Sequence, residues 1–204
     1  MIPTSFLAAG LSVCLVTGAV AQPAVRTPPG ATLSVQPVMT VAHADTLFFE
    51  AAREGRSDVV RALLAAGFSP ELRDARGYTP LILAAYDGHL DTVDLLIAKG
   101  AKACATDSKG NSALMGAAFK GEIAIAERLI AAGCSVSTVN QAGQTTLMMA
   151  SLFGRAKMVT LLLAHGADPS SRDASGNSAV SLARQQGNAD MVALLTSTHP
   201  VGMN

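Results

Sequence analysis

The sequence has no tryptophan, few other aromatic residues and no excess of either charge. Aromatic side chains make up 4% of its 204 residues, and 15 acidic residues balance 15 basic ones. Nucleic-acid binding usually needs a basic excess, so the balance argues against a nucleic-acid partner. Half of the chain is apolar, and alanine and leucine supply much of that half. Strands favour aromatic and β-branched residues, so this composition favours closely packed helices.

No charged side chain occurs in residues 1–21, and their apolar run ends in Ala19-Val20-Ala21. A small-x-small ending of this kind is typical of a secretory signal peptide at its cleavage site. The run is also shorter than the ~20 residues that a membrane-spanning helix needs. We therefore expect export to the periplasm, with secretion as the second choice. Two alternatives stay open, an uncleaved apolar anchor and a lipoprotein modified at Cys14.

Glycine recurs with a fixed period of 33 residues through the rest of the chain. Three series run in step: Gly77, Gly110, Gly143 and Gly176; Gly55, Gly88, Gly121, Gly154 and Gly187; and Gly67, Gly100, Gly133 and Gly166. A fixed period of this length indicates a stacked-repeat protein, in which each repeat packs on its neighbours. Such proteins usually present a binding surface and no reaction pocket.

Each period predicts two short helices followed by a polar tip. Thr79-Pro80 predicts the start of the first helix, with a hydroxyl cap and then proline at the first helical position. This helix should stop at Gly88. A second helix, apolar at spacings of three and four, should end at Gly100, since glycine is common just past a helix end. The polar stretch that ends at Asp107 then predicts a hairpin tip.

Five units are predicted in residues 44–200. They start near residues 44, 77, 110, 143 and 176. Residues 22–43 contain several prolines and predict a flexible linker, and residues 201–204 form a tail. The end units carry Glu50 and Arg184 where central units carry apolar residues, as expected of caps that face water.

The repeat closely resembles the ankyrin repeat. The matching motifs are Thr79-Pro80-Leu81, Ala84-Ala85, Gly88-His89 and Gly100-Ala101. The resemblance covers roughly residues 45–200. It implies an all-α fold, an ankyrin-repeat α-solenoid of five helix-turn-helix units with short hairpin tips. It also implies protein–protein binding through a concave face, by a monomer without chemistry of its own.

Loss of residues 1–21 would leave two cysteines, Cys104 and Cys134, which we expect to stay unpaired. An oxidising compartment permits a disulfide, but the two lie on adjacent repeats and out of step by three residues. Packed helical layers are roughly 8–10 Å apart, whereas a disulfide needs Cα atoms within about 7 Å. Both thiols are therefore interpreted as small apolar fillers of the core.

No catalytic or metal-binding set is visible in the sequence. The histidines are His43, His89, His165 and His199. None has metal-ligand spacing with another histidine or a cysteine, and the glycines recur for turns without forming a phosphate-binding motif. Met148, Met149 and Met158 are interpreted as adaptable core filling, with a metal or oxidation site as the alternative. We expect no enzyme activity, no metal and no cofactor.

The resemblance places the variable binding positions beside the turn glycine and near the end of each first helix. Half of the two tyrosines and six phenylalanines fall there, although the fold does not require aromatic residues at these positions. The predicted partner-binding residues are Tyr78, Tyr86, Asn111, Phe119, Lys120, Gln144, Leu152, Phe153, Arg53, Arg76 and Lys109. Exposed aromatic rings are typical of an interface core. The alternative is that the rings merely shield the small alanines beneath them.

The expected function is binding of an envelope or extracellular protein, with no contact to a membrane after cleavage. The predicted face is mildly basic, but aspartates at the tips offset most of that surplus and leave only a weak preference for an acidic partner. Two alternatives are an accessory factor that protects or assists a periplasmic enzyme, for example by carrying a cofactor, and an exported effector that acts on a host protein.

Overall fold

The computed structural model describes residues 41–197, and these residues form helices joined by turns and hairpin tips. The helices are α1 (Val41–Arg53), α2 (Ser57–Ala65), α3 (Pro80–Asp87), α4 (Leu90–Ala98), α5 (Ala113–Lys120), α6 (Ile123–Ala131), α7 (Thr146–Leu152), α8 (Ala156–Ala164), α9 (Ala179–Gln185) and α10 (Ala189–Ser197). Within this range β-structure is limited to isolated bridges, one of which joins Thr106 to Ser112. The predicted all-α solenoid of five helix pairs is confirmed.

The helix ends follow the sequence signals. The Thr79 hydroxyl accepts a hydrogen bond from the backbone N–H of Ile82, and Pro80 begins α3. The helix ends at Gly88, whose φ of 89° lies in the left-handed region that favours glycine. The later first helices are capped in the same way, as Ser112 shows at the start of α5. Helices α3, α5, α7 and α9 are therefore short and begin with the same kind of hydroxyl cap, whereas α1 is longer, with 13 residues.

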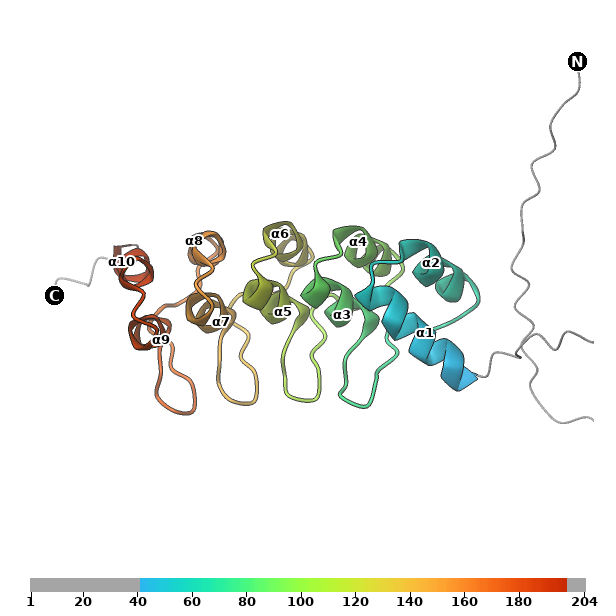
Figure 1. Cartoon of the computed structure of the whole chain (residues 1–204), viewed down its shortest axis with the longest axis horizontal. Coiled ribbons are helices and arrows are strands. Elements are labelled where there is room, and N and C mark those ends of the chain that lie inside the picture. The colour runs from blue at the N-terminus through green and yellow to red at the C-terminus, as the bar shows by residue number, and fades with distance from the viewer. Residues whose placement is uncertain (1–40, 198–204) are drawn as a thin grey trace, which may run out of the picture. The chain divides into compact units, whose positions relative to one another are not determined.

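The helices form two rows (Figure 1). One row holds the first helices α1, α3, α5, α7 and α9, from whose side the tips project; the other holds α2, α4, α6, α8 and α10. The core runs along the stack between the rows. Leu81, Leu114 and Leu147 occupy equivalent positions and are at most 1% exposed. Ala85 and Ala118 are fully buried, and their small side chains allow neighbouring first helices to approach closely.

The tips are held by side chains that bond their own backbone. Asp107 Oδ1 accepts from the N–H groups of Lys109 and Asn111, each at 2.8 Å. Equivalent bonds occur at Asp74, Asn140 and Asp173. Tips also bond to the next tip, since the Gln141 N–H donates to the Lys109 carbonyl at 2.9 Å. The tips therefore form a connected edge along one side of the stack.

One tip carboxylate has a shifted pKa. The hydrogen bond from the backbone N–H of Asn177 lowers the pKa of Asp173, and bonds from the Asn177 side chain and the Ser175 N–H act in the same direction. Because the folded-state pKa is lowered, this carboxylate contributes stability above its unfolded pKa. That contribution is lost as the pH falls through the folded-state value.

The ends of the array differ slightly from the predicted boundaries. Helix α1 begins at Val41, earlier than residue 44, so the last part of the predicted linker is helical. Glu50 and Arg184 are exposed, as expected of capping units. The predicted signal peptide, most of the linker and the tail lie outside the described residues. Within residues 41–197, no helix is both long enough and apolar enough to cross a membrane.

The prediction of two unpaired cysteines is wrong, because Cys104 and Cys134 form a disulfide with their Cα atoms 5.2 Å apart. The layer spacing used in that prediction applies to helix axes and not to the loops between units. The loop after α4 leads along the stack to α5 in the next unit. Cys104 lies six residues after the end of α4, whereas Cys134 lies three residues after the end of α6, so Cys104 is further along the loop that leads to the next unit and the offset brings it close to Cys134. Cys104 is also exposed, so it does not fill the core.

The disulfide should be present in the folded protein and should stabilise it. It links residues separated by 30 positions, and a loop of that length predicts a stabilisation of about 3–4 kcal/mol through the unfolded state. Thiol titration of the denatured, unreduced protein should find neither Cys104 nor Cys134 free. Reductant should then lower the denaturant midpoint of the natural chain and leave a Cys104→Ala, Cys134→Ala double variant unaffected. An equal midpoint with and without reductant would contradict the assignment.

Candidate binding groove

The first helices and the tips border an apolar hollow of about 350 Å³. It is lined by Tyr78, Ile82, Tyr86, Asp107, Asn111, Ser112, Met115, Gly116, Phe119, Gln144, Met149, Leu152 and Phe153. The lining comes from three successive units, so the stack brings together residues that lie far apart in the sequence. Seven of the predicted partner-binding residues meet here, namely Tyr78, Tyr86, Asn111, Phe119, Gln144, Leu152 and Phe153.

Three aromatic rings form a continuous row along the hollow. The Tyr86 and Phe119 rings are stacked, with centroids 5.5 Å apart and planes inclined by 20°. The Phe119 and Phe153 centroids are 4.2 Å apart, with planes inclined by 60°. Tyr86 is 39% exposed and Phe153 42% exposed, whereas Phe119 is half-buried between them. The outer rings therefore present apolar surface to solvent, and the central ring also packs within the fold.

Gly116 opens the hollow in the middle of α5. The equivalent positions in the neighbouring units hold Leu83 and Met149. A Cβ atom at Gly116 would meet its nearest neighbours, atoms of Tyr86, at 3.5 Å, which is ordinary van der Waals contact. The fold therefore has room for a side chain at this position, and its absence leaves space beside the aromatic row. The sequence analysis did not single out Gly116, although the sequence shows a glycine here where the equivalent positions hold Leu83 and Met149.

The predicted polar residues Asn111 and Gln144 are tied into the tips. Asn140 Nδ2 donates to Asn111 Oδ1 at 2.9 Å and to Gln144 Oε1 at 3.0 Å. The Asn111 amide in turn donates to Asp107 Oδ2 at 2.9 Å. These side chains form one network across two tips, so they fix the polar border of the groove.

The predicted basic residues lie around the hollow without lining it. Arg53 and Arg76 line an adjoining hollow of about 270 Å³ that shares Tyr78 and Tyr86 with the first. Arg76 and Lys109 line another between the tips, of about 510 Å³. The Lys120 ammonium lies 4.6 Å from the centroid of the Tyr86 ring, a cation–π contact.

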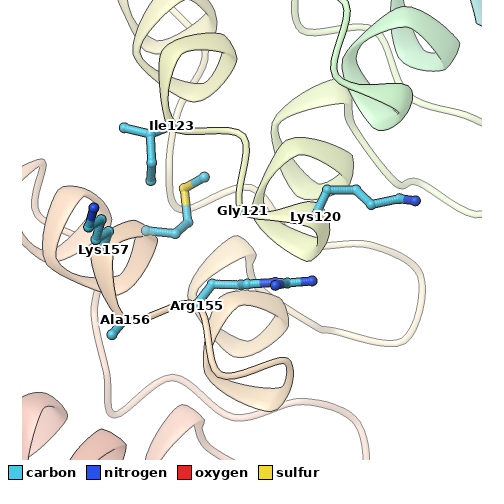
Figure 2. A pocket seen from close by; sticks show the side chains of 7 residues that line it. Lys120, Gly121, Ile123, Arg155, Ala156 and Lys157 are labelled. Carbon is cyan, nitrogen blue, oxygen red and sulfur yellow. The ribbon is translucent and has the colours of Figure 1, made fainter.

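A smaller basic hollow of about 260 Å³ lies where α5 ends and α8 begins (Figure 2). Its lining includes Lys120, Arg155 and Lys157, together with the apolar Ile123 and Met158. Arg155 Nε donates to the Phe119 carbonyl at 3.0 Å, which places the guanidinium beside the residue that carries the central ring of the aromatic row. Figure 2 shows the Lys120 and Arg155 side chains extending to the same side of the hollow. The sequence reasoning missed Arg155 and Lys157, which lie just beyond the positions it examined.

The histidine and methionine positions indicate structural roles. His89 Nε2 lies 2.6 Å from the Arg53 carbonyl and so joins two successive units. Met148 and Met158 are at most 1% exposed, within the core. Within residues 41–197, no group of three or more histidine, cysteine, aspartate or glutamate side chains is placed to hold a metal ion.

Comparison with known proteins gives one family. The sequence model described as ankyrin repeats (3 copies) matches residues 48–140 and, in an overlapping second match, residues 114–203. The two matches cover every helix of the structure apart from the beginning of α1. No curated protein matches the chain significantly.

Gly116→Ala should raise the free energy of unfolding by about 0.5–1 kcal/mol, because alanine is the better helix former and the methyl group fits against Tyr86. Chemical denaturation of the two proteins measures the difference. Gly121→Ala is the matched control. That glycine has a φ of 90°, and an added Cβ would lie 3.1 Å from Arg155 Cδ, so the change should destabilise. A stability loss at Gly116 would show that the glycine serves packing instead of opening a groove.

Proposed function

The chain belongs to the ankyrin-repeat family, and we propose from this premise that it is an exported binding module for one envelope or extracellular protein. Ankyrin repeats are generally protein–protein interaction modules, and they typically lack enzyme activity. The partner is proposed to lie in the groove that contains Tyr86, Phe119 and Phe153. The protein would act as a monomer, without a cofactor, and on a protein instead of a nucleic acid.

The observation that carries this proposal is the aromatic row beside an unfilled hollow. Stacked rings with exposed outer members offer a large apolar surface at low entropic cost, because aromatic side chains have few rotatable bonds. Aromatic residues near the centre of an interface commonly supply most of its binding energy. The surrounding tip network and basic side chains form a polar border, which is the usual arrangement around an apolar interface core.

Two observations support the proposed export. The apolar run that ends at Ala19-Val20-Ala21 has the form of a signal peptide. The Cys104–Cys134 disulfide is suited to an oxidising compartment such as the periplasm or the cell exterior. An enzyme-assisting factor and a host-directed effector would use the same groove, so the identity of the partner separates these alternatives.

Phe119→Ala should weaken binding of the natural partner at least tenfold, since truncation of a central aromatic residue typically costs about 2 kcal/mol or more. Envelope and culture-supernatant fractions would be captured on the natural chain, on this variant and on Lys99→Ala, which changes the exposed end of α4. The candidate partner is the protein retained by the first and third baits, and its affinity for each is then measured by titration calorimetry.

A stability measurement must accompany the Phe119 result. Loss of two ring contacts should lower the free energy of unfolding by about 1–3 kcal/mol, so binding is measured where circular dichroism shows the variant folded. Phe153→Ala removes the more exposed ring and should weaken binding with a smaller loss of stability. Unchanged affinity in both folded variants would favour the alternative in which the rings only shield the core.

The exported chain should begin at Gln22, directly after the predicted cleavage site. Intact-mass measurement of protein recovered from the envelope or medium checks this. Replacing Ala21 by a bulky residue, as in Ala21→Tyr, should block processing and leave the longer chain, because signal peptidase sites require small residues. Recovery of unprocessed natural chain from the cytoplasm would overturn both the cleavage site and the proposed compartment.

A further inference from the structure

We propose that the partner segment bound in this groove is acidic, with one apolar side chain that enters the hollow at Gly116 and carboxylates on either side of it. This inference rests on the proposed function and specifies the chemistry of the partner. It follows from the charges that border the apolar centre and from the bonds that those charged groups already make.

The apolar centre has room for one anchoring side chain. Gly116 contributes no side chain where Leu83 and Met149 stand in the neighbouring units, and the hollow of about 350 Å³ lies beside it. Tyr86 and Phe119 form an aromatic wall, while Met115 and Met149 supply flexible apolar surface. A leucine or phenylalanine side chain fits the chemistry of this lining, whereas a charged side chain would lose hydration there without a partner.

Cations border this centre on both sides. Lys120 ends α5 and Arg155 directly precedes α8, whereas Arg76 and Lys109 lie at the tips. Within residues 41–197 the one ion pair is Arg128–Asp94, which joins α6 to α4 in the other row of helices. The bordering cations therefore have no carboxylate partner of their own. Arg155 uses its Nε to hold the Phe119 carbonyl, which orients the rest of its guanidinium group beside the groove.

The tip aspartates do not offer comparable sites for a basic partner. Asp74 accepts from the N–H groups of Arg76 and Tyr78, and Asp107 is 7% exposed and accepts from three donors. Their negative charge still reduces the long-range field, so the preference arises from direct contact more than from steering. Bonds to ionised groups at contact are stronger than neutral ones, and guanidinium groups suit carboxylates well.

Asp87 limits where the acidic residues can lie. It lines the adjoining hollow with Arg53 and Arg76, toward the N-terminal end of the stack. Like charges repel at contact, so the carboxylates of the partner should lie over Lys120, Arg155 and Lys109 and away from Asp87. The acidic flank is thus placed over the third and fourth units.

Selection from a random dodecapeptide display library on the purified, unreduced protein tests this inference. Peptides eluted from the natural chain but not retained by Phe119→Ala are sequenced. The most frequent one is synthesised with a fluorescent label, together with an isosteric version in which Asp and Glu become Asn and Gln. Dissociation constants are measured by fluorescence anisotropy at 50 and 200 mM salt for the natural chain, Lys120→Glu and the matched control Lys99→Glu.

The expected consensus is an apolar residue flanked by aspartate or glutamate. The natural chain should bind the amide version of the peptide roughly tenfold more weakly than the acidic peptide. Lys120→Glu should bind the acidic peptide roughly tenfold more weakly than the natural chain does, and Lys99→Glu should bind it equally well. Affinity should also fall at the higher salt concentration. Circular dichroism on the variants confirms that these exposed positions do not alter folding.

The other outcomes separate this inference from the proposed function. Groove-dependent peptides that are neutral or basic, or that bind Lys120→Glu as well as the natural chain, would overturn the acidic partner and leave the groove as the binding site. An effect of Lys99→Glu equal to that of Lys120→Glu would also overturn it. If every peptide retained by the natural chain is also retained by Phe119→Ala, so that none passes the selection, or if the natural chain retains no peptide, the result counts against both the acidic partner and the groove as a binding site.

Discussion

Close stacking of alanine-bearing first helices is the constraint on which the rest of this structure depends. Ala85 and Ala118 are fully buried, and the tips that precede the first helices are near enough to bond one another directly. Each unit packs mainly on its neighbours, so the fold is a series of similar interfaces. Left-handed glycines recur at or just after the helix ends, and their fixed spacing keeps the units in register.

This constraint leaves one side of the first helices available for function. The residues that point into the stack must be small or must fit between layers, whereas those at the helix ends and tips are free to vary. The aromatic row lies at this boundary. Its rings stack on one another from unit to unit, so they add to cohesion along the array, while the exposed edges of Tyr86 and Phe153 remain available to a partner. Stability and the proposed binding would therefore depend on the same side chains.

The disulfide, like the core contacts, connects neighbouring units. Cys104 and Cys134 join the loops of two successive units, and the buried core already holds those units together. Such a bond mainly limits the unfolded chain, and it stabilises the third unit and its junction with the second. These units also carry Tyr86, Gly116 and Phe119, so the junction that the disulfide links borders the proposed groove.

The sequence by itself determined the repeat period and most of the helix boundaries. Local signals such as Thr79-Pro80 and Gly88 set the start and end of a helix within one unit. Because these signals recur from repeat to repeat, the helix ends can be predicted without knowing how the units pack. Tertiary structure alone decided the rest. The disulfide depends on the path of a loop between units, and the offset that argued against it in sequence brings Cys104 and Cys134 together in space. The hollow at Gly116 and the place of Arg155 beside Phe119 depend on neighbours 30 or more positions away. Such contacts arise only when one layer is placed on the next.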